Sequence, residues 1–182
     1  MGKKSRRNKS TGGSVVNRRG GGNNVTGWFL YTGQSNASIP RDISHLRIDP
    51  SVKIVLVGAF SECEQLVEVE LCEGLEYIDK EAFLGCRSLK CVKVPSTVKI
   101  IGEGAFADCY QLMKVELCEG LEYIGYDTFS NCASLESIEI PSSVKTIAVG
   151  AFQHCEALQK VELSEGLEKI QARAFCGCAS LA

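Results

Sequence analysis

A phenylalanine recurs every 23 residues along most of this chain, and no other feature limits the possible folds so strongly. The series is Phe60, Phe83, Phe106, Phe129, Phe152 and Phe175. A cysteine follows each phenylalanine by three residues, and a leucine follows each cysteine by three more. Four further apolar columns, which begin at Val69, Leu71, Leu75 and Ile78, keep the same spacing. The chain is therefore a tandem repeat with seven apolar positions in each unit.

A unit of 23 residues is too short to bury its own apolar face, so neighbouring units must stack on one another. Residues 66–71 alternate apolar and polar side chains, which predicts a short strand, and equivalent strands should pair in parallel. We expect residues 75–78 to cross the back of each coil and residues 80–86 to form a helical turn. The predicted fold class is a solenoid of 23-residue coils, mostly β with short helical turns, whose parallel strands form one broad sheet facing solvent.

The motif Cys-x-x-Leu-x-x-Val-x-Leu, followed by Leu-x-x-Ile-x-x-x-Ala-Phe-x-x-Cys, resembles the BspA-like leucine-rich repeat of bacterial surface proteins and protist proteins. The resemblance covers about residues 44–182 and implies a leucine-rich-repeat solenoid of about six repeats with a curved, mostly β interaction surface. It carries over no catalytic residue. One departure is that Cys72 and Cys118 stand where Pro95 and Pro141 stand in alternate units, which gives a second period of 46 residues.

A polar column supports the same stacking. Its members alternate in sign without exception and are Lys53, Glu76, Lys99, Glu122, Lys145 and Glu168. Because neighbouring strands lie ~4.8 Å apart, each charge should sit between two opposite charges. The column is expected to set the register of the coils more than to add stability, since exposed ion pairs are weak.

The formal charge of −2 is distributed unevenly along the chain. Residues 1–41 carry eight basic side chains and no acidic one, so residues 42–182 sum to −10. We expect residues 1–26 to form a disordered basic tail, and nucleic acid could bind only there, because the acidic body repels phosphates. The basic residues of this tail are Lys3, Lys4, Arg6, Arg7, Lys9, Arg18 and Arg19. The tail is typical of a nuclear-import or RNA-binding segment, or of a solubilising extension.

Two further expectations concern the ends of the stack. Residues 27–43 should form an N-terminal capping segment, since the run from Trp28 to Tyr31 supplies four large apolar side chains ahead of a degenerate first unit. The chain stops at Ala182, where another strand would begin, so the C-terminal end of the solenoid, residues 44–182, should be uncapped. That end either associates with another chain, in an end-to-end contact, or belongs to a fragment or a shortened gene model.

Cysteine and histidine positions argue against metal, redox or catalytic chemistry. The six periodic cysteines lie in an apolar column, where a thiol packs as a small hydrophobic group, and Cys91 is the best candidate for an accessible thiol. Cys176 and Cys178 lack the second pair that a zinc site needs. His45 and His154 lie nearly five coils apart, and no phosphate-binding loop or nucleophile motif occurs. We therefore expect no enzyme activity and no cofactor.

Location is inferred from apolar segments and cysteine use. The sequence has no apolar run long enough to span a membrane, and no secretory signal at its N-terminus as the chain stands. A chain with ten cysteines and no signal is expected in a reducing compartment, so the predicted location is intracellular, cytoplasmic or nuclear.

The exposed face of the strands is the candidate working surface. The columns predict an acidic patch there, flanked by two lysines, which could receive a basic partner or a cation, although a solvated strand face has the same pattern. The candidate residues for partner binding are Glu70, Lys93, Met113, Lys114, Glu116, Glu136, Glu139, Lys160 and Glu162. The predicted function is a non-catalytic scaffold that binds another protein through this face. The alternatives are a nuclear or ribonucleoprotein accessory factor, which contacts nucleic acid through the tail, and a cell-surface adhesin.

Overall fold

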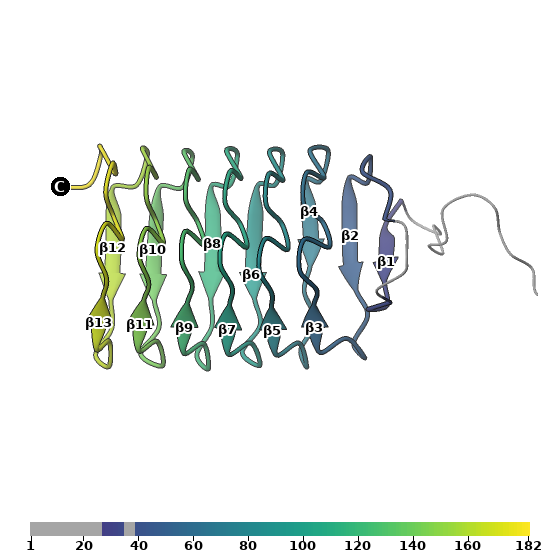
Figure 1. Ribbon diagram of the computed structural model, residues 1–182, viewed down its shortest axis with the longest axis horizontal. Coiled ribbons are helices and arrows are strands. Elements are labelled where there is room, and N and C mark those ends of the chain that lie inside the picture. The colour runs from purple at the N-terminus through teal and green to yellow at the C-terminus, as the bar shows by residue number, and fades with distance from the viewer. Residues whose placement is uncertain (1–26, 35–38) are drawn as a thin grey trace, which may run out of the picture.

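The computed structural model describes residues 27–34 and 39–182, which form two parallel β-sheets (Figure 1). The long-strand sheet has seven strands in the order β1 (Phe29–Tyr31), β2 (His45–Ile48), β4 (Glu68–Glu70), β6 (Cys91–Val94), β8 (Lys114–Leu117), β10 (Ser137–Ile140) and β12 (Lys160–Leu163). The short-strand sheet has six strands of two residues each: β3 (Ile54–Val55), β5 (Tyr77–Ile78), β7 (Ile100–Ile101), β9 (Tyr123–Ile124), β11 (Thr146–Ile147) and β13 (Lys169–Ile170).

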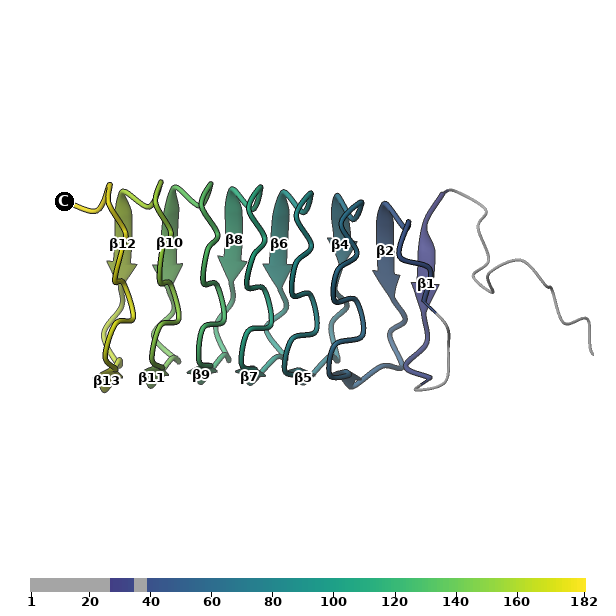
Figure 2. The same ribbon diagram turned by 45° about the horizontal axis from the view of Figure 1, so that its top comes forward.

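The register between neighbouring strands equals the sequence repeat. Val92 pairs with Val115 in the long-strand sheet, and Ile78 pairs with Ile101 in the short-strand sheet. The repeated phenylalanine rings stack from coil to coil with centroids 5.0–5.5 Å apart and interplanar angles of 15° or less. The predicted solenoid of parallel 23-residue coils is therefore confirmed. The coils stand in a nearly straight row, so the curvature implied by the family resemblance is slight over this stretch (Figure 2).

The repeated apolar columns fill the interior between the two sheets. Alternation decides which side chains enter it, so that β6 buries Val92 and Val94 and exposes its other two residues. Each buried cysteine from the second unit onward donates its S–H to the carbonyl of the phenylalanine 26 residues earlier, as Cys86 does to Phe60 at 3.3 Å. Like side chains thus pack on like side chains, and short units make one continuous core.

The turn after each short strand corrects one expectation. The sequence predicts a helical turn over residues 80–86, whereas the described residues contain no helix. N–H groups in this segment alternate between two acceptors: that of Leu84 donates to Glu81, three residues back, and that of Phe83 donates to Ala105 in the next coil. A helix needs consecutive N–H groups to bond within the segment, so stacking of the coils replaces it with hydrogen-bonded turns.

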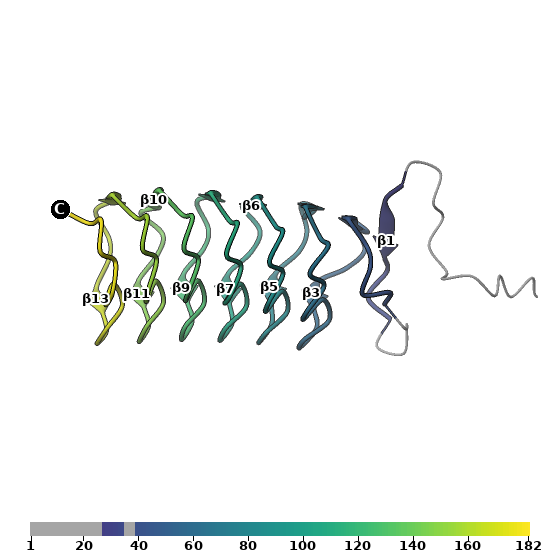
Figure 3. The same cartoon turned by 90° about the horizontal axis from the view of Figure 1, so that it is seen from above.

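The sequence predicts one broad sheet, and the structure has two. Residues 75–78 do cross the back of the coil, but Tyr77 pairs with Ile100 and so belongs to a strand. The reason is the regular stacking, which sets N–H and C=O groups of neighbouring coils opposite each other wherever the backbone is extended. Figure 3 shows the long strands along one side of the row and the short strands nearer the other.

The N-terminal end of the stack begins with β1, which pairs in parallel with β2 through Phe29 and Leu46. Tyr31 on β1 is buried, and its ring meets that of Phe60 edge-on at 5.0 Å. This segment adds a strand to the long-strand sheet and covers the first ring of the phenylalanine stack. The basic residues from Lys3 to Arg19 lie outside the described residues.

Backbone hydrogen bonds link the alternating charged column from coil to coil. The N–H of Glu76 donates to the carbonyl of Lys53, and that of Lys99 donates to Glu76. Among the described residues, this column forms ion pairs toward one neighbour only, at 3.3 Å between Lys53 and Glu76 and at 3.9 Å between Lys99 and Glu122. The Nζ of Lys53 also donates to the carbonyl of Gly74 at 3.1 Å, and every second coil repeats this bond. The charges are thus in the expected register, but each is paired on one side at most.

Candidate interaction surface

All nine residues that the sequence nominates for partner binding lie on the outer side of the long-strand sheet. Seven of them belong to β4, β6, β8, β10 and β12, while Met113 and Glu136 directly precede β8 and β10. Eight are exposed, and Glu116 is half-buried. We call the outer side of β4 to β12 the strand face. Because one regular sheet holds these side chains, their mutual positions are fixed by backbone hydrogen bonds.

Ion pairs neutralise much of the predicted acidic patch. Glu116 contacts Lys114 at 2.5 Å and Lys93 at 3.6 Å, and these lysines lower the pKa of its carboxyl. Lys160 bonds to Glu162 on the last long strand. Within the part of the chain that the structure describes, Glu139 forms no ion pair. Glu136 forms none among those residues either, so the carboxylates of Glu139 and Glu136 stay available to an incoming cation.

Two seams divide the strand face where neighbouring long strands part. β6 pairs with β8 through four residues, and β10 pairs with β12 through four. In contrast, β4 meets β6 only at Glu68 and Cys91, and β8 meets β10 only at Lys114 and Ser137. The parted seams recur every second coil, with the same period as the exchange of cysteine for proline in the sequence.

Proline accounts for the two-coil period. At the closed seam between β10 and β12, the N–H of Ser164 donates to the carbonyl of Ile140 at 3.2 Å. Pro95 and Pro141 occupy the matching position at the parted seams and have no N–H to donate. Each proline therefore ends the ladder early, and the strands separate toward their C-terminal ends.

A shallow hollow of about 440 Å³ occupies the seam between β8 and β10. Glu116 and Cys118 line it from the side of β8, and Glu139 lines it from β10. The hollow thus sets two carboxylates around a gap that a flexible cationic side chain could enter. Sequence reasoning named these carboxylates and missed the hollow, for which the exchange of Cys118 for Pro141 was the available signal.

The outer side of the short-strand sheet carries an apolar stripe that sequence reasoning also missed. Ile54, Tyr77 and Ile100 follow one another on β3, β5 and β7 and are 37–40% exposed. Each precedes a fully buried residue, such as Ile78 after Tyr77, in a two-residue strand. Adjacent strand residues point to opposite faces, so two neighbouring apolar columns cannot both be buried. That pair of columns was the sequence signal for the stripe.

The thiols do not form a chemical site in the described residues. All ten cysteines lie there, and none is in a disulfide. Burial raises the pKa of Cys155 to about 12 and holds that of Cys132 well above the ordinary value. Cys91 on β6 is exposed, as predicted, and so is Cys176.

Nowhere in 27–34 or 39–182 do three or more histidine, cysteine or acidic side chains gather in a way that could hold a metal ion. No helix in those ranges has the length and apolar content to cross a bilayer. The strand face and the apolar stripe are the two exposed surfaces with a distinct character in these residues.

Comparisons with known proteins agree with this geometry. The sequence model described as "BspA type Leucine rich repeat region" matches residues 39–158 and 78–182, with six copies. The crystal structure of a T. pallidum leucine-rich repeat protein, TpLRR, superimposes with a TM-score of 0.67 at 26% identity, over 85% of this chain and 78% of that chain. A comparison with curated protein sequences finds no match.

Two longer proteins share the fold. A leucine-rich repeat protein from Eubacterium ventriosum superimposes with a TM-score of 0.61 at 23% identity, over 83% of this chain and 46% of that chain. The pneumococcal vaccine antigen PcpA superimposes with a TM-score of 0.57 at 25% identity, over 76% of this chain and 35% of that chain. The matched region is less than half of either longer chain.

Proposed function

Because the chain belongs to the BspA-type leucine-rich repeat family, we propose that it is a non-catalytic scaffold that binds another protein through the strand face. Members of this repeat family are commonly protein-binding or surface scaffolds. The observation that carries the proposal is the hollow at the parted seam between β8 and β10, which Glu116 and Glu139 line. A flat strand face without such a feature would give a partner little to recognise.

The partner that fits this seam presents a lysine or arginine side chain. Glu139 forms no ion pair among the described residues, so a cation that enters there displaces no internal lysine. Glu136 adds negative charge next to β10, and the half-exposed side chain of Met113 offers apolar contact for the aliphatic stem of the incoming residue. Opposite charge steers the partner to the seam, and the shape of the hollow selects among basic partners.

An affinity capture with two baits tests this surface. One bait carries Glu116→Ser, Glu139→Ser and Glu162→Ser together, and it should lose the proteins that the unchanged chain retains. A matched control bait carries Glu64→Ser, Glu156→Ser and Glu165→Ser, which removes the same charge from exposed positions outside the long strands. If the strand-face bait and the unchanged chain recover the same proteins, the binding surface lies elsewhere.

A second candidate function rests on the basic tail. Residues 1–41 carry a charge of +8, which could hold nucleic acid while the acidic body recruits a protein. A chain that lacks residues 1–22 separates the two readings. Loss of salt-sensitive RNA binding on deletion favours a nuclear or ribonucleoprotein accessory factor, whereas unchanged binding partners favour the scaffold.

The proposed location is intracellular, cytoplasmic or nuclear. The ten unpaired thiols support it, because thiols stay reduced in those compartments. Similarity to PcpA, described as a vaccine antigen, favours a cell-surface scaffold instead. Protease treatment of intact cells distinguishes the two: an intracellular protein survives it, and a surface protein is digested.

A further inference from the structure

The apolar stripe on the short-strand sheet is not used by the proposed function. We extend the stripe by one coil to β9, so that it comprises the exposed Ile54, Tyr77 and Ile100 and the half-buried Tyr123. A hollow of about 250 Å³ lies along its first three residues. The stripe ends after four coils, because the next two positions are Thr146 and Lys169. Contiguous exposed apolar side chains, bounded by polar ones, mark an interaction surface.

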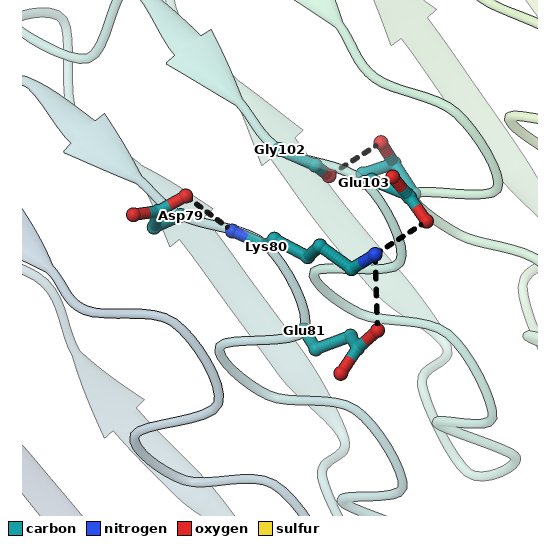
Figure 4. Close-up of polar contacts among 6 residues, drawn as sticks. Asp79, Lys80, Glu81, Gly102 and Glu103 are labelled. Atoms are coloured by element: carbon teal, nitrogen blue, oxygen red, sulfur yellow. Dashed lines mark hydrogen bonds and ion pairs between the residues drawn. The ribbon is translucent and has the colours of Figure 1, made fainter.

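Charged rows border the stripe and alternate in sign as well. One row is Lys53, Glu76, Lys99 and Glu122. On the other side, Lys80 and Glu103 lie between Val57 and Tyr126 in successive coils. Figure 4 shows the Nζ of Lys80 reaching Glu103 at 2.8 Å and Glu81 at 3.6 Å. Within these four coils, reversing the coil order therefore exchanges every lysine with a glutamate and every isoleucine of the stripe with a tyrosine.

A two-fold axis performs this reversal. The axis lies in the plane of the face, parallel to the short strands and midway between β5 and β7. It sets the face of one copy against the face of another, with the coil order reversed and each row opposite itself. Tyr77 then faces Ile100 of the second copy, and Ile54 faces Tyr123. Lys80 faces Glu103, Glu76 faces Lys99, and Lys53 faces Glu122.

We propose that two copies of this chain associate through the short-strand face about this axis. A second copy matches both the alternation of charge and its spacing of ~4.8 Å automatically, because it carries the same rows. Each facing pair joins a lysine with a glutamate or two apolar side chains, Val57 with Tyr126 included, so no like charges meet across the axis. The two charged rows and the stripe are all complementary when the axis lies midway between β5 and β7.

The position of the axis is specific. If the two-fold axis moves by one coil, to midway between β7 and β9, the Lys53 row stays complementary. Ile54 then faces Lys169, however, and Glu103 faces Tyr126. Charged groups would be set against apolar ones at both places, which costs their hydration without a compensating pair. The stripe and the Lys80 row therefore select one register among those that the first charged row allows.

The extent of the face predicts a weak dimer. Four coils at ~4.8 Å spacing give a contact about 15 Å long. A contact of that length and similar width falls below the ~800 Å² per partner of a standard interface. We expect a dissociation constant on the order of 10–100 µM, so association should depend steeply on concentration in that range.

Charge reversal tests the proposed pairing. Lys80→Glu sets two glutamates against each other across the axis, and Glu103→Lys sets two lysines against each other. Each variant alone should be monomeric by analytical ultracentrifugation at concentrations where the unchanged chain dimerises. Mixed in equal amounts, the two variants should form a heterodimer, because each charge again faces an opposite one. The internal ion pair between Lys80 and Glu103 is lost in both variants and is not restored by mixing, so recovery reports the contact between copies.

A second pair of variants distinguishes association through this face from non-specific hydrophobic association. Tyr77→Ser should weaken the dimer at least tenfold, whereas Tyr110→Ser should not change it, although the two tyrosines are similarly exposed at 39% and 43%. Circular dichroism confirms that each variant is folded. The proposal is overturned if the unchanged chain stays monomeric at 1 mM, roughly tenfold above the expected dissociation constant. It is also overturned if the mixed charge variants fail to associate, or if the dimer survives Tyr77→Ser.

Discussion

The two sheets come from the same coils, yet their outer sides differ in character. The outward residues of β6 are Cys91 and Lys93, whereas the outward residue of β7, in the same coil, is Ile100. A long strand alternates polar and apolar residues and so shows a polar side to solvent, while a two-residue strand of apolar residues must expose one of them. A repeat therefore fixes what is buried, and each outward column remains free to form a surface of its own kind.

The largest predicted effect is a loss of stability in both sheets at once, because the two sheets share one core. Phe106 is fully buried, with ring centroids 5.0 Å from Phe83 and 5.5 Å from Phe129. Phe106→Ala removes a ring from the middle of the stack, and we expect the free energy of unfolding in urea to fall by ~3–5 kcal/mol. Amide exchange should accelerate in the neighbouring strands of both sheets.

A matched substitution controls for the residue type. Phe175 stacks on one phenylalanine and is only half-buried, so Phe175→Ala should cost clearly less than Phe106→Ala. Equal losses for the two variants, or exchange that accelerates in one sheet alone, would mean that the faces do not share a common support.

A smaller effect sharpens the contrast between the two sides of one coil. A Cβ on Gly102, directly after β7, would lie 2.8 Å from the backbone N of Lys80 and 2.9 Å from the carbonyl carbon of Asp79. Gly102→Ala should therefore lower the free energy of unfolding by ~1–3 kcal/mol, since backbone must move. Cys91→Ala, at an exposed position of β6, should change it by less than ~0.5 kcal/mol. Similar losses in urea unfolding would mean that the neighbouring coil leaves room for a Cβ at Gly102.

The sequence predicts the buried columns of the two sheets, and the residues that alternate with them, better than it predicts the other features. The phenylalanine and cysteine columns have one spacing and one environment, so they predict the stacked coils and the strand register directly. Seven of the nine candidate residues share a face because they alternate with buried ones in the long strands, as Lys93 does with Val92 in β6. These features follow from periodicity alone.

Other features depend on the backbone, and their sequence signals are weaker. The helical turn predicted over residues 80–86 is absent because neighbouring coils supply hydrogen-bond acceptors that an isolated segment lacks. The parted seam at Pro141 follows from a missing N–H, which becomes visible only when Ser164 shows the bond that a non-proline residue makes. The stripe at Tyr77 needed the second sheet, because its residue pattern also fits a buried crossing segment.

The smallest predicted effect concerns the interior that lies between the two faces. Burial raises the pKa of Cys155 from the ordinary thiol value of 9.0 to about 12. Because the folded pKa lies above the unfolded one, this thiol contributes its full stability below pH 9, and the contribution is lost as the pH rises from 9 toward 12. Over the first pH unit above that point, ionisation in the unfolded chain should cost about 1 kcal/mol for this thiol.

Urea unfolding at pH 9 and pH 10 measures this loss for the interior thiol. Cys155→Ala should lower the free energy of unfolding at pH 9. Between pH 9 and pH 10 this variant should then lose about 1 kcal/mol less free energy of unfolding than the unchanged chain, since one ionising group has been removed. Val144→Ala is the control, because it leaves a cavity in the same core and removes no thiol. It should lower stability equally at both pH values. If the two variants show the same dependence on pH, the Cys155 thiol ionises as readily inside the coil as outside it, and the cysteine column is not shielded by the two sheets.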